Sequence, residues 1–185
     1  MHRGTIVVAG GLSPDAAATD QNISDRVMAY SPEIDSWCDL TRLPQPRHHG
    51  YLLSFNDELL LFGGFIAADG GRWSASRDVL CLHGDRWEQI TQMPDAQCET
   101  VATSHAGAIH LVGGRAPHGA SNADWNDHAD IAAHRIFQSD DNSWHQAAPA
   151  PTTRNSAAGV VIYGHWYVVG GRTVSGGNLA VNRSV

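Results

Sequence analysis

GTIVVAGG (residues 4–11) is the first of four stretches in which a short, mostly apolar run ends in a Gly-Gly doublet. The other three are DELLLFGG at 57–64, GAIHLVGG at 107–114 and GHWYVVGG at 164–171. Apolar runs of this length are typical of buried strands. Glycine tolerates positive φ and the close approach of another backbone segment, so each doublet predicts a sharp exit from its strand.

Three tryptophans recur in step with the doublets. Trp37, Trp87 and Trp144 each precede the second glycine of the next doublet by 27 residues, whereas 26, 23 and 30 residues separate a doublet from the tryptophan that follows it. One half of the repeat therefore has a constant length, and all variation in length falls in the other half. A period near 50 residues with these marks indicates an array of similar structural units.

These marks resemble the kelch repeat, in which about 50 residues form one blade of a β-propeller. The resemblance covers the whole chain. It implies an all-β fold of kelch-type blades, each with four antiparallel strands that we name a to d from the propeller axis outward. Runs that fit strand c precede each tryptophan, which stands on strand d, and they lie at residues 26–30, 78–82 and 135–137.

The repeat positions predict a single partial propeller over residues 1–185. Its parts are 1–43 (blade 1, strands b, c and d), 44–93 (blade 2), 94–150 (blade 3) and 151–185 (part of blade 4, with the start of strand c near 179–185). About three and a half blades cannot close into a ring. The chain is therefore a fragment of a six- or seven-bladed protein, a part completed by a second copy or another chain, or an open array stable by itself.

Alternating strand directions place the b–c loops and the d–a connections at the same end of every blade, here called the top face. The b–c loops carry the variation in length and lie at 12–24, 65–77, 115–133 and 172–178. Recognition residues concentrate in variable loops on a constant scaffold. The candidate binding residues of the top face are Arg47, His48, Arg72, Trp73, Arg77, Arg115, His118, Trp125, His128 and Arg154.

Several of these candidates have two interpretations. Trp73 and Trp125 lie outside the tryptophan position of the repeat, so either they form a contact surface or they pack their own loops down. The three tryptophans of the repeat are instead expected to wedge between adjacent blades. Arg47 and Arg154 recur in the connections. Either they ring the channel mouth to attract an anion, or they form an interblade ion pair or a hydrogen bond to loop carbonyl groups.

The amino-acid composition argues against two classes of partner, nucleic acid and membranes. The formal net charge is −7 and lysine is absent, which argues against nucleic acid because phosphate binding needs clustered basic residues. No 18-residue apolar run is present, and the N-terminal apolar stretch is too short for a signal peptide, so we expect no membrane span and a cytoplasmic location. The three cysteines lack paired spacing, and Cys81 is expected to be a core residue.

Metal and cofactor chemistry is not predicted. The third b–c loop groups oxygen and nitrogen donors that suit a metal ion, namely His118, Asp124, Asp127, His128 and Asp130. They lack the regular spacing of a helical metal site, and a polar loop collects such residues by composition alone. The chain has no phosphate-binding loop, nucleophile elbow or dinucleotide fingerprint. No metal and no cofactor are therefore expected.

The predicted function is a kelch-repeat interaction module that binds a protein partner through the b–c and d–a loops of the top face. The resemblance to kelch-type enzymes leaves an alternative, a carbohydrate-active enzyme similar to sialic acid mutarotases. Glu99, His48 and Arg47 would then supply the acid–base pair and hold the sugar carboxylate. A copper oxidase resembling galactose oxidase is disfavoured because no ligand set can be assigned among four tyrosines. An inactive fragment is the third possibility.

Overall fold

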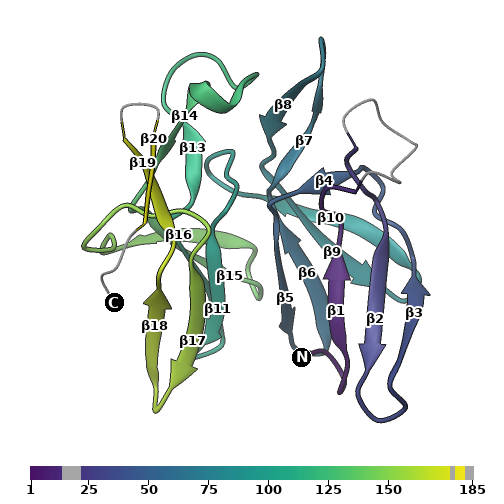
Figure 1. Ribbon diagram of the computed structural model, residues 1–185. Coiled ribbons are helices and arrows are strands. Elements are labelled where there is room, and N and C mark those ends of the chain that lie inside the picture. The colour runs from purple at the N-terminus through teal and green to yellow at the C-terminus, as the bar shows by residue number, and fades with distance from the viewer. Residues whose placement is uncertain (14–21, 176–177, 182–185) are drawn as a thin grey trace.

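The computed structural model describes residues 1–13, 22–175 and 178–181, and these residues are built of antiparallel β-sheets (Figure 1). Blade 2 consists of β5 (Tyr51–Phe55), β6 (Glu58–Phe62), β9 (Asp78–His83) and β10 (Arg86–Gln92). Blade 3 consists of β11 (Val101–His105), β12 (Ala108–Val112), β15 (His134–Gln138) and β16 (Ser143–Ala147). In both, the strands pair in the order a, b, c, d, which confirms the predicted all-β fold of four-stranded antiparallel blades.

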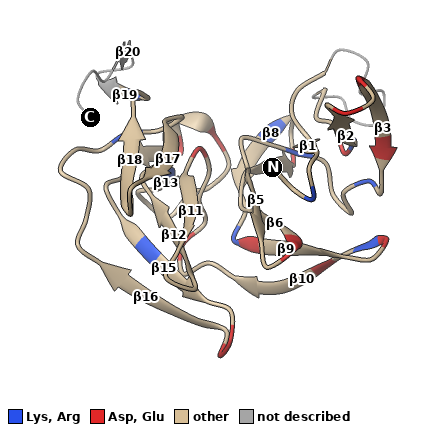
Figure 2. Ribbon diagram, turned by 90° about the horizontal axis from the view of Figure 1, so that it is seen from below, with Lys and Arg blue, Asp and Glu red and all other residues tan. Residues whose placement is uncertain are grey.

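Shorter sheets flank these two blades. Blade 1 consists of β1 (Ile6–Ala9), β2 (Val27–Ser31) and β3 (Ser36–Leu40), which pair as strands b, c and d. Blade 4 consists of β17 (Ala158–Ile162) paired with β18 (His165–Val169). The inner strands adjoin, since β11 contacts both β5 and β17. Seen from below, the blades stand side by side without closing into a ring in the described residues (Figure 2).

One turn conformation joins strands a and b in successive blades. Both residues of each turn have positive φ, between 49° and 79°, and the turns are Asn56-Asp57, Ala106-Gly107 and Tyr163-Gly164. Two-residue turns of this kind match the right-handed twist of the strands they connect. They lie at the end of the molecule opposite the top face, as the turn between β17 and β18 shows (Figure 1).

The b–c segments, expected to be loops, form β-hairpins in the described residues. They are β7 (Phe65–Ala68) with β8 (Arg72–Ala75), β13 (Arg115–Pro117) with β14 (His128–Asp130), and β19 (Arg172–Ser175) with β20 (Asn178–Val181). All three rise from the top face (Figure 1). Most of the first b–c segment, residues 14–21, lies outside the described residues.

Each hairpin pairs with the connection that precedes its blade. β4 (Arg47–His48) pairs with β7, and the bridges Cys98–Arg115 and Asn155–Arg172 repeat this contact in the next two blades. Because β20 pairs with β19, the expected start of strand c near residues 179–185 is wrong for 179–181, and 182–185 lie outside the described residues.

Two apolar clusters fill the spaces between blades. The cluster between blades 2 and 3 includes Phe62, Val79, Cys81, Met93, Ile109, Leu111 and Phe137. The cluster between blades 1 and 2 includes Val27, Leu43, Leu59, Leu61, Leu80 and Trp87. Strands b of blades 2 and 3 are therefore buried almost throughout, as their apolar runs predict, and Cys81 is the expected core residue.

The tryptophans of the repeat differ in burial. Trp87 is 6% exposed and donates from Nε1 to the carbonyl oxygen of Thr41 in blade 1, at 2.9 Å. Trp144 is half-buried, with its ring centroid 4.9 Å from that of Phe137. Trp37 is 52% exposed. The expected wedge between blades is confirmed for Trp87 and wrong for Trp37, because the described residues contain no preceding blade for Trp37 to pack against.

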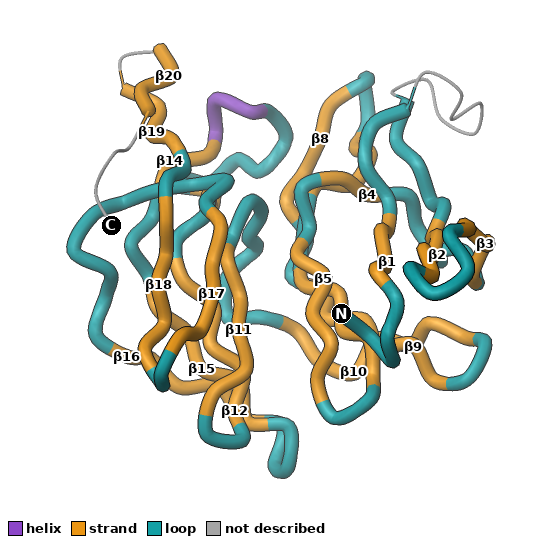
Figure 3. The backbone as a smooth tube through the Cα atoms, turned by 60° about the horizontal axis from the view of Figure 1, so that its bottom comes forward, coloured by secondary structure: helices purple, strands orange, loops and turns teal. Residues whose placement is uncertain are grey.

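A single short helical element interrupts the strands in the described part of the chain (Figure 3). This 3-10 turn, η1 (Trp125–Asp127), lies between β13 and β14. Asp124 caps it, since its side chain accepts from the backbone N–H of Asn126. Among the described residues, no helix has the length and apolar character needed to cross a membrane.

Candidate functional site

Two top-face hairpins from neighbouring blades are fastened to each other. Asn122, between β13 and η1, accepts through Oδ1 from the backbone N–H of Ala75 and donates from Nδ2 to the carbonyl oxygen of Ala75, both at 2.9 Å. Nε2 of His128 lies 2.8 Å from the same Oδ1. Because Ala75 ends β8, this double hydrogen bond sets the hairpin of blade 2 against that of blade 3.

An open pocket of about 220 Å³ lies between these hairpins. Its lining residues are Gly71, Arg72, Trp73, Ala123, Asp124 and Trp125. The fully buried ring of Phe65 supports both indoles, with centroid distances of 6.1 Å to Trp73 and 5.8 Å to Trp125. The two tryptophans singled out from the sequence therefore line one pocket, although they belong to different blades.

Arg115 supports the second indole from within the blade. Its guanidinium carbon lies 3.7 Å from the ring centroid of Trp125, and its Nη2 donates to the carbonyl oxygens of Trp125 and His128 at 3.1 and 2.6 Å. Asp130 pairs with its Nε at 3.6 Å. A buried arginine stacked on an aromatic face and bonded to the loop backbone fixes the ring's orientation.

The acidic loop residues stabilise the fold of their own hairpin. Oδ2 of Asp127 accepts from Oγ of Ser121 and from the backbone N–H groups of Ala123 and Asp124, at 2.5 to 3.0 Å. The Ser121 bond is the largest cause of the lowered pKa of Asp127. Asp124 and Asp127, two of the five residues considered from the sequence as a metal site, are thus engaged in closing the turn around η1.

A second arrangement lies where the inner strands begin. His49, Glu99 and Ser156 hold equivalent positions in blades 2, 3 and 4, and all have positive φ, of 56°, 54° and 49°. The backbone N–H of Glu99 donates to the carbonyl oxygen of His49 at 2.8 Å, and that of Ser156 donates to Glu99 at 3.0 Å. These bonds link blades 2, 3 and 4. We call this set of three residues the channel mouth.

Glu99 carries the chemistry of the channel mouth. Its side chain is fully buried, and its Oε1 accepts from Nη2 of Arg172 at 2.9 Å and lies 3.5 Å from Nε2 of His49. Among the residues that the structure describes, its Oε2 has no hydrogen-bond partner. Burial lowers the pKa of His49, while the charge of Glu99 opposes that shift and the charge of Arg172 adds to it. A buried carboxylate beside a neutral imidazole is an arrangement that can exchange protons with a ligand.

The connection arginines have a repeated internal partner. Nη1 of Arg47 donates to the carbonyl oxygen of Gly63 at 3.1 Å, and Nη1 of Arg154 donates to Gly170 at 2.9 Å. Gln97, which replaces arginine in the blade between them, donates to the first glycine of its own blade's doublet at 2.6 Å. Asp78 also pairs with Arg47, at 3.6 Å. The geometry shows the predicted hydrogen bonds to carbonyl groups, whereas the ion pair of Arg47 with Asp78 lies within blade 2 and not between blades.

His48 lies under the first hairpin. It is 2% exposed, and its ring centroid is 4.2 Å from that of Trp73 and 5.4 Å from that of Phe65. Burial, with a smaller contribution from the neighbouring His49, lowers its pKa to about 4. His48 is therefore a neutral ring at physiological pH, and it packs beneath the pocket.

Comparisons with known proteins agree with the repeat pattern. The chain is 28% identical to beta-scruin of Limulus polyphemus over 114 residues (61% of this chain, 12% of scruin), and 24% identical to kelch-like protein 35 of Mus musculus over 170 residues (91% and 26%). Kelch-like protein 40a of Danio rerio is 26% identical over 110 residues (60% and 18%). No family model matches. Together with the repeated marks and the four-stranded blades, these relatives show that the chain is similar to kelch-repeat proteins.

A solved structure shows the same fold. The structure of YjhT aligns with a TM-score of 0.74 at 14% identity and covers 98% of this chain and 63% of that one. At this identity the likeness concerns the fold. The chain spans between about an eighth and a quarter of the length of the curated relatives that it matches.

The candidate binding residues fall into three groups. Arg72, Trp73 and Trp125 line the pocket. A second group is buried beneath the top face and consists of Arg47, His48, Arg115, His128 and Arg154. Arg77 and His118 are exposed at the sides of the hairpins, and Nε of Arg77 donates to the carbonyl oxygen of Met93 at 2.8 Å.

Three residues of these arrangements were not singled out from the sequence. Asn122 is one of many polar loop residues, and only the fold reveals its double bond to Ala75. His49 and Arg172 contact Glu99, whereas the sequence had paired Glu99 with His48 and Arg47. Alignment of the repeats places His49 and Glu99 at equivalent positions, and this was the available signal.

One further donor set lies at the opposite end of blade 2. Glu58, Cys81 and His83 place their ligand atoms within 4.8 Å of one another. Burial, together with the charge of Glu58 and the hydrogen bond that the thiol donates to it, raises the pKa of Cys81 to about 12. A metal ion needs the thiolate, so this thiol is poorly prepared to bind one.

Proposed function

We propose that this chain is an interaction module whose top-face hairpins bind a protein partner. Support for the proposal comes from Trp73 and Trp125, which come from different blades and line one open pocket. Tryptophan and arginine are the residues most enriched among those that dominate interface affinity. Arg72, exposed on the rim of the same pocket, supplies the cation.

Preorganisation of the pocket favours binding over mere loop packing. Asn122 holds the two hairpins together, and Arg115 and Phe65 support the indoles from below. Side chains that are already ordered lose little freedom when a partner docks, so more of the contact energy appears as affinity. The occupant we propose is an apolar or aromatic side chain on an exposed segment of the partner.

The test compares four forms of the protein: wild type, Trp73→Ala, Arg72→Glu and the control Arg86→Glu. Arg86, the first residue of β10 in the same blade, has a side chain that is 76% exposed. A partner is identified by cross-linking to wild type, and its affinity for each form is measured by biolayer interferometry. We expect Trp73→Ala to weaken binding about 30-fold, which corresponds to about 2 kcal/mol, and Arg86→Glu to leave it unchanged.

The same series separates binding from packing. If Trp73→Ala lowers the free energy of unfolding while the partner's affinity stays at the wild-type value, the indole only packs its hairpin and the proposal fails. Equal loss of affinity with Arg72→Glu and Arg86→Glu would indicate a general effect of charge instead of a defined surface.

A carbohydrate-active site at the channel mouth is the second candidate function. The buried Glu99, with an unpartnered Oε2 beside His49 and Arg172, favours it. Opening the ring of an acidic sugar requires removal of a proton from the anomeric hydroxyl group and delivery of a proton to the ring oxygen. Glu99 and His49 have the groups for these two transfers, and the guanidinium of Arg172 suits the sugar carboxylate.

Exchange spectroscopy tests this candidate directly. The rate of interconversion between the anomers of N-acetylneuraminic acid is measured by NMR with wild type, Glu99→Gln and the control Glu88→Gln, an exposed residue of β10. Acceleration by wild type and by Glu88→Gln, but not by Glu99→Gln, would support the enzyme. A wild-type rate equal to that in buffer would exclude it for this sugar.

A further inference from the structure

Two histidines on adjacent strands of blade 3 face each other at an unusual position. His110 lies on β12 and His134 begins β15, and their register places His134 diagonally across from His110 on the same face of the sheet. Nδ1 of His110 lies 3.0 Å from Nε2 of His134. Both rings are half-buried on the side of blade 3 that faces β18, outside the top-face pocket and the channel mouth.

The tautomer of His134 follows from its other contact. Its Nδ1 lies 3.2 Å from the carbonyl oxygen of Ala148, and because a carbonyl group only accepts, Nδ1 must carry the proton. In the neutral ring, Nε2 is then an unprotonated nitrogen whose lone pair faces His110. A histidine anchored through Nδ1–H to a backbone carbonyl group, with Nε2 free to bind, is the usual orientation of a metal ligand.

The separation of the two nitrogens fits a particular coordination geometry. With metal–nitrogen bonds of about 2.0 to 2.1 Å, a nitrogen–nitrogen distance of 3.0 Å corresponds to an angle of about 94° at the metal. A tetrahedral ion requires about 109°, whereas tetragonal Cu²⁺ has ligands near 90°. Cu²⁺ also binds nitrogen ligands more tightly than the other divalent ions of the first transition series.

The surroundings supply a reporter. The ring centroid of Trp166, on β18 of blade 4, lies 5.8 Å from that of His134 and 6.3 Å from that of His110.

We propose that His110 and His134 form a Cu²⁺-binding site between blades 3 and 4, with water completing the coordination. The proton between the two facing nitrogens must move before the ion binds. His110 then carries its proton on Nε2, and its Nδ1 offers a lone pair to the ion. Because Trp166 belongs to the next blade and its ring lies beside both imidazoles, its fluorescence reports an ion bound at this site.

The experiment titrates CuCl2 into the 185-residue chain and follows tryptophan fluorescence and electron paramagnetic resonance. The background is His2→Asn, since a free N-terminal amine followed by histidine would compete for copper. The variants are His110→Gln and His134→Gln, with His145→Gln as the control, an exposed histidine on β16 of the same blade. The fluorescence reporter is assigned by comparison with Trp166→Phe.

We expect binding of one Cu²⁺ with nitrogen hyperfine structure and quenching that disappears in Trp166→Phe. His110→Gln and His134→Gln should each weaken binding at least about tenfold, and His145→Gln should not. Equal copper affinity in all three variants would overturn the proposal. If the two variants unfold, the test uses the protein with both histidines intact and follows the NMR signals of its imidazoles. Selective broadening of the His110 and His134 signals by Cu²⁺ supports the site. Broadening confined to other histidines refutes it.

Discussion

Arg47 shows how one position of the repeat combines structure with sequence variation. Its guanidinium donates to the carbonyl oxygen of Gly63 from a buried position, and Gln97 makes the corresponding bond in the next blade with an uncharged amide. The requirement at this position is therefore a donor that reaches the first glycine of the doublet. A positive charge on this donor is secondary, because it is stabilised only where an acidic partner such as Asp78 lies within reach.

Substitution at Arg47 tests this requirement. We expect Arg47→Ala to lower the free energy of unfolding by about 2 kcal/mol, because it leaves the carbonyl group of Gly63 buried without a donor. Arg47→Gln should cost less, since the chain already uses glutamine for this bond in blade 3. Urea denaturation measures both. Equal destabilisation by the two variants would show that the ion pair with Asp78, and not the bond to Gly63, is what matters.

His48 predicts how stability depends on pH. The unfolded chain protonates this residue below about pH 6.5, but the folded chain does so only near a pKa of about 4. Its contribution is therefore complete above pH 6.5 and is lost as the pH falls from 6.5 to 4, at up to roughly 1.4 kcal/mol for each pH unit. Comparison of His48→Asn with wild type at several pH values isolates this slope. Parallel curves for the two proteins would contradict it.

At the same scale, the site was only partly predictable. Trp73 and Trp125 stood out because they break the tryptophan rhythm of the repeat, and the structure brings them into one pocket. The partners of Glu99 were not predictable, because adjacent residues in an extended segment point to opposite sides. The positive φ of His49 turns it toward Glu99 while His48 points under the hairpin. That local reversal is a property of the fold and not of residue type.

The Gly-Gly doublets show why the element ends are so regular. The first glycine of the doublet in blade 2, Gly63, has φ of +54°, and a Cβ added there would lie 2.1 Å from the carbonyl oxygen of Gln97 in the next connection. Gly64 has φ of +92°, and a Cβ added there would lie within 2.9 Å of backbone atoms of His48 and Gly50. The doublet therefore combines a left-handed exit from strand b with close contact to neighbouring backbone.

A pair of alanine substitutions separates these two demands. Gly84, in the turn between β9 and β10, has φ of +61° and nothing within 4 Å of an added Cβ. We expect Gly84→Ala to cost about 1 to 2 kcal/mol from backbone strain alone, and Gly63→Ala to cost about 3 kcal/mol or more because the steric clash is added. Thermal unfolding of both variants provides the comparison. Similar midpoints would mean that the connection moves aside without cost.

Elements were predictable where the repeat constrains them. Strands b of blades 2 and 3 follow from continuous apolar runs, and strand c lies where short apolar runs precede each tryptophan. The sequence predicts loops where the b–c hairpins lie, because these segments are polar and unequal in length. Their strands form by pairing with the preceding connection, as β4 does with β7, and such a contact across the chain leaves no periodic signal.

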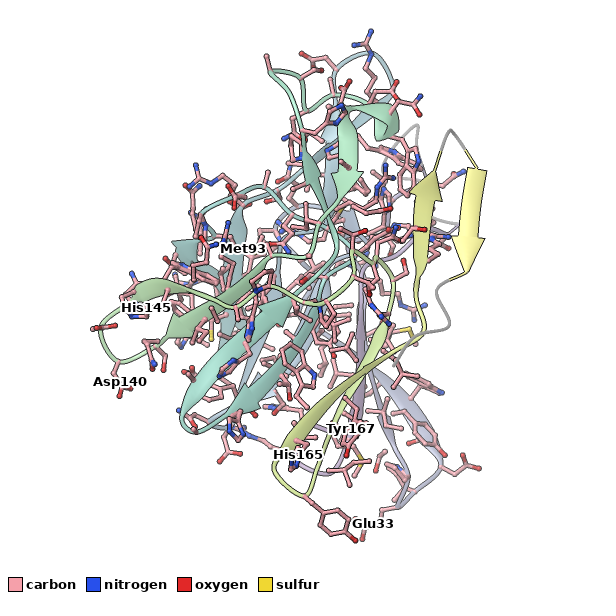
Figure 4. All side chains as sticks on the ribbon, turned by 90° about the vertical axis from the view of Figure 1, so that its left-hand side faces the viewer. Glu33, Met93, Asp140, His145, His165 and Tyr167 are labelled. Atoms are coloured by element: carbon pink, nitrogen blue, oxygen red, sulfur yellow. The ribbon has the colours of Figure 1, made fainter. Side chains whose placement is uncertain are left out.

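At the scale of the whole molecule, the outermost described sheet presents an apolar surface. Val160 and Ile162 on β17 share a face with Tyr167 and Val169 on β18, and these side chains are between 42% and 47% exposed. Figure 4 shows Tyr167 and His165 on this hairpin. The opposite face, around Gly159 and Trp166, packs toward Val101 of blade 3. An equivalent outer face in blade 2 or 3 is covered by the next blade, which explains its apolar character here.

Self-association of the chain is the prediction that follows from this surface, because contiguous exposed apolar side chains favour burial against a partner. We expect the mass in solution to exceed 19.9 kDa and to rise with concentration, measured by size exclusion with light scattering. Val160→Lys places a charge in the middle of the face and should reduce the mass toward that of one chain. The control is Ile34→Lys, which changes a 71% exposed isoleucine in the turn between β2 and β3. If wild type has the mass of a single chain at every concentration, this face is stable in water and a ring formed by a second copy is excluded.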